Sequence, residues 1–183
     1  MRKKIIVTLL IVFITWSNWH YVVYLYNTIT LDSNIKILPT DKTEEVMGYQ
    51  ELLSHKVLSG KPGLVLINNG WTREKLLKLD HPRIYANCEQ EGWNLIYLSN
   101  EFGDQKYNRT KANWLNRICS YNMLGYHLYP SEPFELFDKY INKVKTQTGE
   151  TYAMPHALIL NNRGNVTDTL YSYNKNEISR LIK

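Results

Sequence analysis

The hydrophobic and polar positions from residue 59 onward alternate between strand and helix patterns. Short apolar runs predict buried strands at 64–69, 93–99, 156–160 and 165–170. Helical spacing of apolar residues predicts helices at 73–91, 105–122, 133–145 and 177–182. This order, β-α-β-α-α-β-β-α, places a parallel strand pair with a crossover helix before an antiparallel hairpin. The pattern therefore predicts an α/β fold with a mixed central sheet and helices on both faces.

Local residues refine two of these elements. Pro82 lies inside the helical pattern of residues 73–91 and predicts a kink there. Asn161-Asn162-Arg163-Gly164 separates the last two strands and is typical of a hairpin turn. The side chains expected to face inward from the two longest helices are Leu76, Leu79, Ile84 and Cys88, and Trp114, Leu115 and Ile118.

The first 26 residues have the pattern of a targeting segment. Three basic residues precede an apolar run at 5–14, and no charged residue follows until after Leu31. A helix over residues 5–26 is long enough to span a bilayer. The aromatic residues that suggest an interfacial belt are Trp16, Trp19, Tyr21, Tyr24 and Tyr26. We expect a signal anchor at 1–26. A cleaved signal peptide and a buried N-terminal helix are the alternatives.

The positive charges of this segment also predict its orientation. Arg2, Lys3 and Lys4 favour the cytoplasm, which places the remaining chain on the periplasmic side of a bacterial membrane. Cleavage of the signal would instead give a secreted or periplasmic protein. Residues 27–58 are polar and read as a linker and lead-in, so the main domain is expected at 59–183.

Charge and composition exclude several functions. The net charge is +5, of which the first basic residues supply three, so no basic surface for nucleic acid is expected. The five histidines lie far from one another and from both cysteines, which predicts no metal site. Nothing in the sequence indicates a small-molecule cofactor.

Two motifs carry a resemblance to a known family. Gly60-Lys61-Pro62-Gly63 and the strand that follows, ending at Asn68, resemble the start of TlpA-like, membrane-anchored thioredoxins. Tyr152-Ala153-Met154-Pro155, followed by residues 157–166, resembles that family's later Y-x-x-x-P-x-x-x-hydrophobic-D-x-x-G-x-I pattern. The resemblance covers about residues 50–183. It implies a thioredoxin-like (redoxin) fold for the main domain.

The resemblance breaks at the cysteine pair. The chain has no CxxC, and an ungapped alignment places the family's two cysteines on Glu74 and Leu77. A rival register places them on Thr72 and Lys75. Disulfide exchange needs a thiolate that attacks a disulfide, and neither register offers a sulfur. We therefore assign no catalytic residue and expect no ordinary thiol–disulfide catalysis.

The two cysteines of the chain lie elsewhere in the pattern. Cys88 is near the far end of the first predicted helix, and Cys119 is on the next one. Two separate buried thiols are expected. A structural disulfide, favoured by an oxidising compartment, and a redox-active thiol are the alternatives.

The resemblance also implies a peptide-binding groove. It predicts a cis bond between Met154 and Pro155, whereas a trans proline beginning a strand is the plain alternative. The residues expected around the groove are Asn69, Gly70, Trp71, Thr72, Met154 and Pro155. An extended peptide could pair there through its backbone, which needs no sulfur. Trp71 could equally well cap the core.

Three titratable residues near these motifs are weaker candidates. His81, His156 and Glu74 could serve in acid–base chemistry, although lone histidines are usually structural. The expected function is thus an extracytoplasmic thioredoxin-like protein that binds a peptide or protein in the envelope. The alternatives are a thiol–disulfide oxidoreductase that uses a non-standard cysteine and a structural envelope protein.

Overall fold

The computed structural model contains two compact units. One unit comprises residues 1–32 and 103–122, and the other comprises residues 33–102 and 123–183. The residues that the structure describes are 18–38, 58, 60–69, 72–100, 107–128, 142–146, 149–153, 155–173 and 178.

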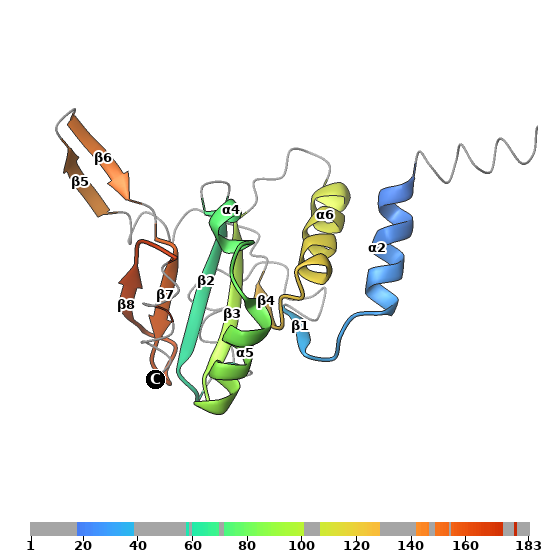
Figure 1. The fold of residues 1–183 in the computed structure, drawn as a ribbon, viewed down its shortest axis with the longest axis horizontal. Coiled ribbons are helices and arrows are strands. Elements are labelled where there is room, and N and C mark those ends of the chain that lie inside the picture. The colour runs from blue at the N-terminus through green and yellow to red at the C-terminus, as the bar shows by residue number, and fades with distance from the viewer. Residues whose placement is uncertain are drawn as a thin grey trace, which may run out of the picture. The chain divides into compact units, whose positions relative to one another are not determined.

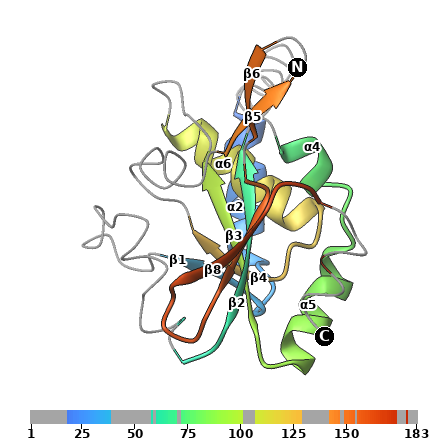
Figure 2. The same cartoon turned by 90° about the vertical axis from the view of Figure 1, so that its left-hand side faces the viewer.

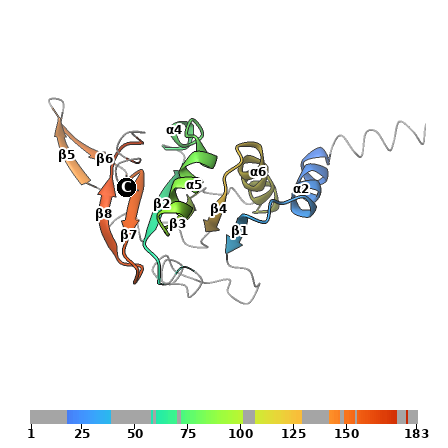
Figure 3. The same ribbon diagram turned by 60° about the horizontal axis from the view of Figure 1, so that its bottom comes forward.

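The larger unit is built on a six-stranded mixed sheet. The strands are β1 (Ile35–Leu38), β2 (Gly63–Asn69), β3 (Asn94–Asn100), β4 (Gly125–Leu128), β7 (Ala157–Leu160) and β8 (Val166–Leu170). Figures 1 and 3 show them in the order β1-β4-β3-β2-β7-β8. β1, β4, β3 and β2 pair in parallel, whereas β7 and β8 run antiparallel. The predicted mixed sheet is confirmed.

The central strands are buried on both faces, which their continuous apolar runs explain. One face carries Val65 and Ile67 of β2 beside Ile96 and Leu98 of β3, as the strand register requires. On the opposite face Leu66, Tyr97 and His127 are neighbours in register across β2, β3 and β4. This second face bears the helices α4 and α5 and is called the α5 face below.

The predicted helix at 73–91 is wrong as a single kinked element. The structure has two helices, α4 (Arg73–Leu76) and α5 (His81–Gln90), and Figure 2 shows both on one side of the sheet. Asp80 caps α5 by accepting a hydrogen bond from the Arg83 N–H at 3.3 Å. Because Pro82 lacks an N–H, it fits in the first turn of a helix and not in its interior, so a new helix begins there.

The burial of this helical segment follows the predicted pattern with one exception. Leu76, Leu79 and Cys88 are buried, but Ile84 is only half-buried. The helices expected on the other face of the sheet stay a prediction, because the next helix of the chain belongs to the other unit.

The hairpin of β7 and β8 confirms the predicted turn at residues 161–164. The Asn161 side chain accepts hydrogen bonds from the N–H groups of Arg163 and Asn165 at 2.9 and 3.0 Å. Gly164 has a φ of +78°, a conformation that glycine adopts readily. This is the local Asx geometry that an asparagine in a turn provides.

A second hairpin contradicts a predicted helix. β5 (Asn142–Thr146) pairs antiparallel with β6 (Gly149–Ala153), so the helix predicted at 133–145 is wrong at residues 142–145. The remainder of that range lies outside the described residues. The alternation of lysine with Val144 and Thr146 fits a strand period of two, which the helical reading of the longer range concealed.

Two further strands were not predicted. β1 falls within the segment read as a linker, and β4 falls between two predicted helices. Each has four residues, which is too short for a periodic signal to stand out. β4 pairs with β3 and β1 pairs with β4, which extends the sheet on one side.

In the smaller unit, the described residues form two packed helices. α2 (Trp19–Ile29) contacts α6 (Tyr107–Ser120), and the Asn27 amide donates to the Asn116 side-chain oxygen at 2.6 Å. α6 confirms the predicted helix at 105–122. Its residues Trp114, Leu115 and Ile118 are buried, as predicted.

Both ends of the chain extend beyond the described residues. Within the described part, no helix is long and apolar enough to cross a membrane. Most of the expected anchor, residues 1–17, lies outside that part, so the anchor stays a prediction. The predicted helix at 177–182 is likewise untested apart from Ile178, which is helical and buried.

Gly125 provides a test of how closely β4 approaches β3. Its φ is +119°, and a Cβ there would stand 2.6 Å from the Leu95 carbonyl oxygen. We expect Gly125→Ala to lower the free energy of unfolding by about 2–4 kcal/mol. The control is Gly92→Ala. Gly92 has a φ of +72°, but a Cβ built there meets no neighbouring side chain or backbone atom within 4 Å, so this substitution should lower the free energy of unfolding by only about 1 kcal/mol. Equal losses in urea denaturation would argue against the close strand packing.

Candidate functional site

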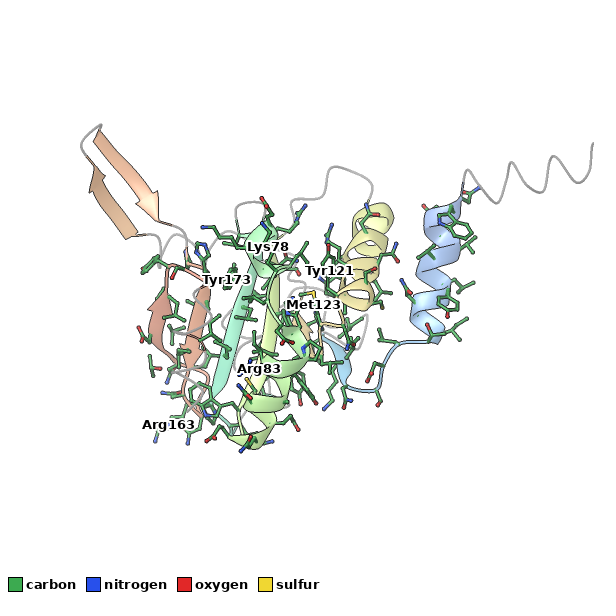
Figure 4. The ribbon with its side chains drawn as sticks, in the orientation of Figure 1. Lys78, Arg83, Tyr121, Met123, Arg163 and Tyr173 are labelled. Carbon is green, nitrogen blue, oxygen red and sulfur yellow. The ribbon has the colours of Figure 1, made fainter. Side chains whose placement is uncertain are left out.

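The carboxyl end of β2 is closed by side chains from two other segments. Thr72 Oγ1 donates a hydrogen bond to the Ile67 carbonyl oxygen at 2.6 Å. The Tyr173 hydroxyl donates to the same oxygen, and Figure 4 shows Tyr173 beside this end of β2. The Ile67 N–H in turn donates to the His156 carbonyl at 2.8 Å. The backbone of one residue, Ile67, therefore joins the turn before α4, the start of β7 and the segment after β8.

Beside the Ile67 backbone lies an aromatic pair of buried His156 and half-buried Tyr173. The rings of His156 and Tyr173 meet edge to face, with centroids 5.0 Å apart. Burial holds the pKa of Tyr173 well above its usual value, although hydrogen bonds with Thr72 and the Ile67 backbone act in the opposite direction. The phenol therefore stays protonated and remains a hydrogen-bond donor near neutral pH.

The structure brings some of the predicted groove residues together. Thr72 and Pro155 are both buried at this end of the sheet, and Asn69 ends strand β2. Gly70, Trp71 and Met154 lie outside the described residues. The groove itself and the cis bond before Pro155 therefore stay predictions.

The positions that replace the cysteine pair offer no alternative nucleophile. Glu74 is exposed and pairs with Lys78 at 2.6 Å, and that hydrogen bond and charge lower the pKa of Glu74. A lowered pKa is unfavourable for a general acid. In either register the remaining positions are Leu77, which is half-buried, Thr72, which is buried and bonded to Ile67, and Lys75, which is exposed.

The two thiols have environments that disfavour thiolate chemistry. Both cysteines are free, so no disulfide joins them. Burial, with a smaller contribution from the charge of Glu89, raises the pKa of Cys88 to about 12. Burial also raises the pKa of Cys119, which is partly buried in α6. Catalytic cysteines have lowered pKa values, so both shifts have the wrong direction for a nucleophile.

A buried polar cluster occupies the α5 face of the sheet. His81 Nδ1 and the Tyr97 hydroxyl are 3.0 Å apart, and the Tyr97 ring stacks on His127 at 4.7 Å. His127 Nε2 donates to the Met123 carbonyl at 2.7 Å. Burial is the main cause that lowers the pKa of both histidines to about 4. The two imidazoles are therefore neutral at pH 7 and enclosed in the core.

Sequence reasoning found only part of this cluster. His81 was considered as an acid–base group, but its exposed fraction is only 1%, which suits a structural role. Tyr97 and His127 were missed. The sequence signal for them is that each lies within a short, largely apolar segment. Strand alternation places both side chains on the same face of the sheet, the α5 face.

Comparison with known proteins gives partial likenesses only. No protein-family model and no curated protein sequence matches the chain. The solved structure of peroxiredoxin 6 of Arenicola marina is 18% identical with a TM-score of 0.46, over 70% of this chain and 62% of that one. The chain thus spans less than two thirds of the length of that protein.

Two further solved structures are similar over comparable lengths. The bacterioferritin comigratory protein of Xanthomonas campestris is 11% identical with a TM-score of 0.47, over 68% of this chain and 77% of that one. A thiol:disulfide interchange protein of the thioredoxin family from Chlorobium tepidum is 16% identical with a TM-score of 0.43, over 69% and 82%. All these TM-scores lie below 0.5.

The buried histidines predict a loss of stability in acid. Each has a folded-state pKa of about 4 against 6.5 in the unfolded chain, so below pH 6.5 the unfolded chain binds protons that the folded protein does not. Stability should fall by about 1–2 kcal/mol per histidine between pH 6.5 and pH 5. His127→Gln should reduce the loss of unfolding free energy between pH 6.5 and pH 5 by the contribution of one histidine, as measured by urea denaturation at several pH values. If the dependence of stability on pH is unchanged in this variant, His127 is not a buried neutral histidine.

The hydroxyl of Thr72 predicts a second effect on stability. Thr72→Val keeps the shape and removes the donor to Ile67, so we expect a loss of about 1–2 kcal/mol. The matched control is Thr167→Val, which removes a longer hydrogen bond of 3.2 Å from a more exposed threonine and should cost less than about 0.5 kcal/mol. Equal effects of the two substitutions would show that the β2 turn does not depend on Thr72.

Proposed function

We propose that the larger unit is a thioredoxin-like domain that binds extended peptide segments and does not exchange disulfides. The two motifs that resemble TlpA-like thioredoxins are adjacent in the sheet. The first leads into β2 and the second into β7, and these strands pair antiparallel. Gly60 of the first motif also donates to the Asn162 carbonyl in the turn of the second, at 3.0 Å. Segments far apart in sequence thus meet where the family resemblance requires.

The observation that carries the proposal is the closed, sulfur-free turn after β2. In either alignment the family's cysteines fall on residues that carry no sulfur. Thr72 instead uses its hydroxyl to close the turn onto Ile67. The Thr72 hydroxyl is therefore engaged in a structural hydrogen bond, and we propose that it has no role as a reactive group.

Peptide binding remains available to such a domain because it depends on backbone groups. The backbone N–H of His156 donates to Leu170 and its carbonyl accepts from Ile67, so both groups are already used inside the domain. A bound peptide must therefore pair with the backbone that precedes Pro155. We therefore expect the pairing at the backbone of Met154, with Trp71 as the side-chain contact that the resemblance implies.

The proposed location is the outer side of a bacterial membrane. Support comes from the sequence, in which basic residues precede the apolar run at 5–14 and aromatic residues follow it. A tether over residues 5–26 would leave the larger unit free to meet partners in the envelope.

A thiol–disulfide oxidoreductase is the second candidate. The free thiols of Cys88 and Cys119 favour it, because either could serve as a non-standard redox cysteine. The raised pKa of each thiol disfavours it. A structural envelope protein is the third candidate, and no specific contact supports it.

Binding of an unfolded polypeptide tests the proposal. The full-length chain should bind fluorescein-labelled, carboxymethylated lactalbumin, and Trp71→Ala and Met154→Ala should each weaken binding about tenfold, since each removes a wall of the groove. The control is Tyr171→Ala, an exposed aromatic residue just after β8, which should bind as the parent does. Fluorescence anisotropy gives the dissociation constants. Equal constants for all four proteins would reject the groove.

A further inference from the structure

The helix α2 carries an exposed apolar stripe. Its members follow helical spacing of three and four residues and are Trp19, Val22, Leu25, Tyr26 and Ile29. Trp19 is 57% exposed and Ile29 is 75% exposed, which are high values for large apolar side chains. A contiguous exposed apolar surface of this kind marks an interaction site.

The stripe is not the side by which α2 packs on α6. That contact is made on the other side of the helix, where Asn27 is half-buried and donates to Asn116. Val23 is also half-buried on that side. One side of α2 is therefore used within the smaller unit, and the opposite side is left apolar and uncovered by any described residue.

The chemistry of the stripe fits a lipid surface. No residue of α2 carries a formal charge, and its exposed aromatic residues combine an apolar ring with a polar N–H or O–H. Such residues prefer the boundary between acyl chains and headgroups. The sequence directly before α2 contains the apolar run at 5–14 and three basic residues, which favour an anionic bilayer.

The length and one-sidedness of α2 indicate how it meets that surface. Its 11 residues extend about 16 Å, roughly half the thickness of the hydrocarbon core. A helix that is apolar on one side and packed on a protein partner on the other is suited to lying along an interface.

We propose that the α2 stripe lies along the lipid–water interface, with α6 on its water side, and holds the two-helix unit at the bilayer surface. The proposal rests on the tether in the proposed function to bring α2 to the membrane. It takes the apolar run at 5–14 as the inserted part of that tether, because residues 19–26 cannot both cross a bilayer and lie along its surface. It adds a second, flat contact formed by residues 19–29. The unit would then be fixed in orientation as well as in place.

Environment-sensitive labels on the full-length chain test this contact. In a Cys88→Ala, Cys119→Ser background, NBD is attached to cysteines introduced one at a time at Leu25, Tyr26 and Ile29, which are on the stripe. The matched control is a label at Thr28, which is exposed but off the stripe. The proteins are reconstituted into vesicles of phosphatidylcholine and phosphatidylglycerol, with and without headgroup-level nitroxide lipid.

The proposal expects a periodic result. The three stripe labels should be blue-shifted and quenched severalfold by nitroxide lipid, while the Thr28 label stays water-like and unquenched. A smooth decay of quenching along the helix, without periodicity, would overturn the proposal in favour of a span. Stripe labels that stay water-like in a chain that floats with vesicles would overturn it but leave the tether intact.

Two further outcomes would also overturn it. If the chain fails to float with vesicles at all, both the tether and the flat contact are rejected, whereas binding of the lactalbumin probe is unaffected. If the stripe labels are blue-shifted without lipid and respond to protein concentration, the stripe is covered by a second copy of this chain.

Discussion

The backbone of Ile67 is the point on which the arrangement of the larger unit depends. Its carbonyl accepts hydrogen bonds from Thr72 and Tyr173, and its N–H donates to the His156 carbonyl. β2 would otherwise end with exposed backbone groups at the edge of a buried sheet, which is costly. These three contacts fix the turn before α4, the chain around Pro155 and the segment after β8 at one place. In the two alignments on which the proposed function rests, the first cysteine of the TlpA-like family falls on Thr72 or Glu74, in or next to this turn.

The chemistry of the surrounding core is consistent with a structural use of polar groups. Thr72 and Tyr173 both act as neutral donors, and the raised pKa of Tyr173 keeps its hydroxyl protonated. On the α5 face, His81 and His127 enclose Tyr97 and stay uncharged because they are buried. Buried polar groups that are hydrogen-bonded specify one packing arrangement at little cost, whereas a charge there would be expensive. These described polar groups therefore serve the packing of the core as neutral hydrogen-bond partners.

The sequence predicted the parts of the fold that have strong local signals. The continuous apolar runs of β2 and β3 form strands that are buried on both faces of the sheet, as their sequence pattern predicts. Asn161 and Gly164 form the turn between β7 and β8. Pro82 was recognised, but as a kink, because the capping role of Asp80 decides between a bent helix and a new one. The four-residue strands β1 and β4 were missed, since they exist only through pairing with each other and with β3. The same holds for the candidate site, where the role of Tyr173 depends on a contact across 106 residues.

The account's central claim is that the turn after β2 is a structural closure and that neither thiol of the chain takes over its chemistry. Reduction of insulin by the full-length chain, with dithiothreitol as electron donor, tests this claim most directly. We expect insulin to precipitate at the rate seen with dithiothreitol alone, and the Cys88→Ser and Cys119→Ser variants to behave identically. Turnover above that background which disappears when either cysteine is replaced would contradict the account.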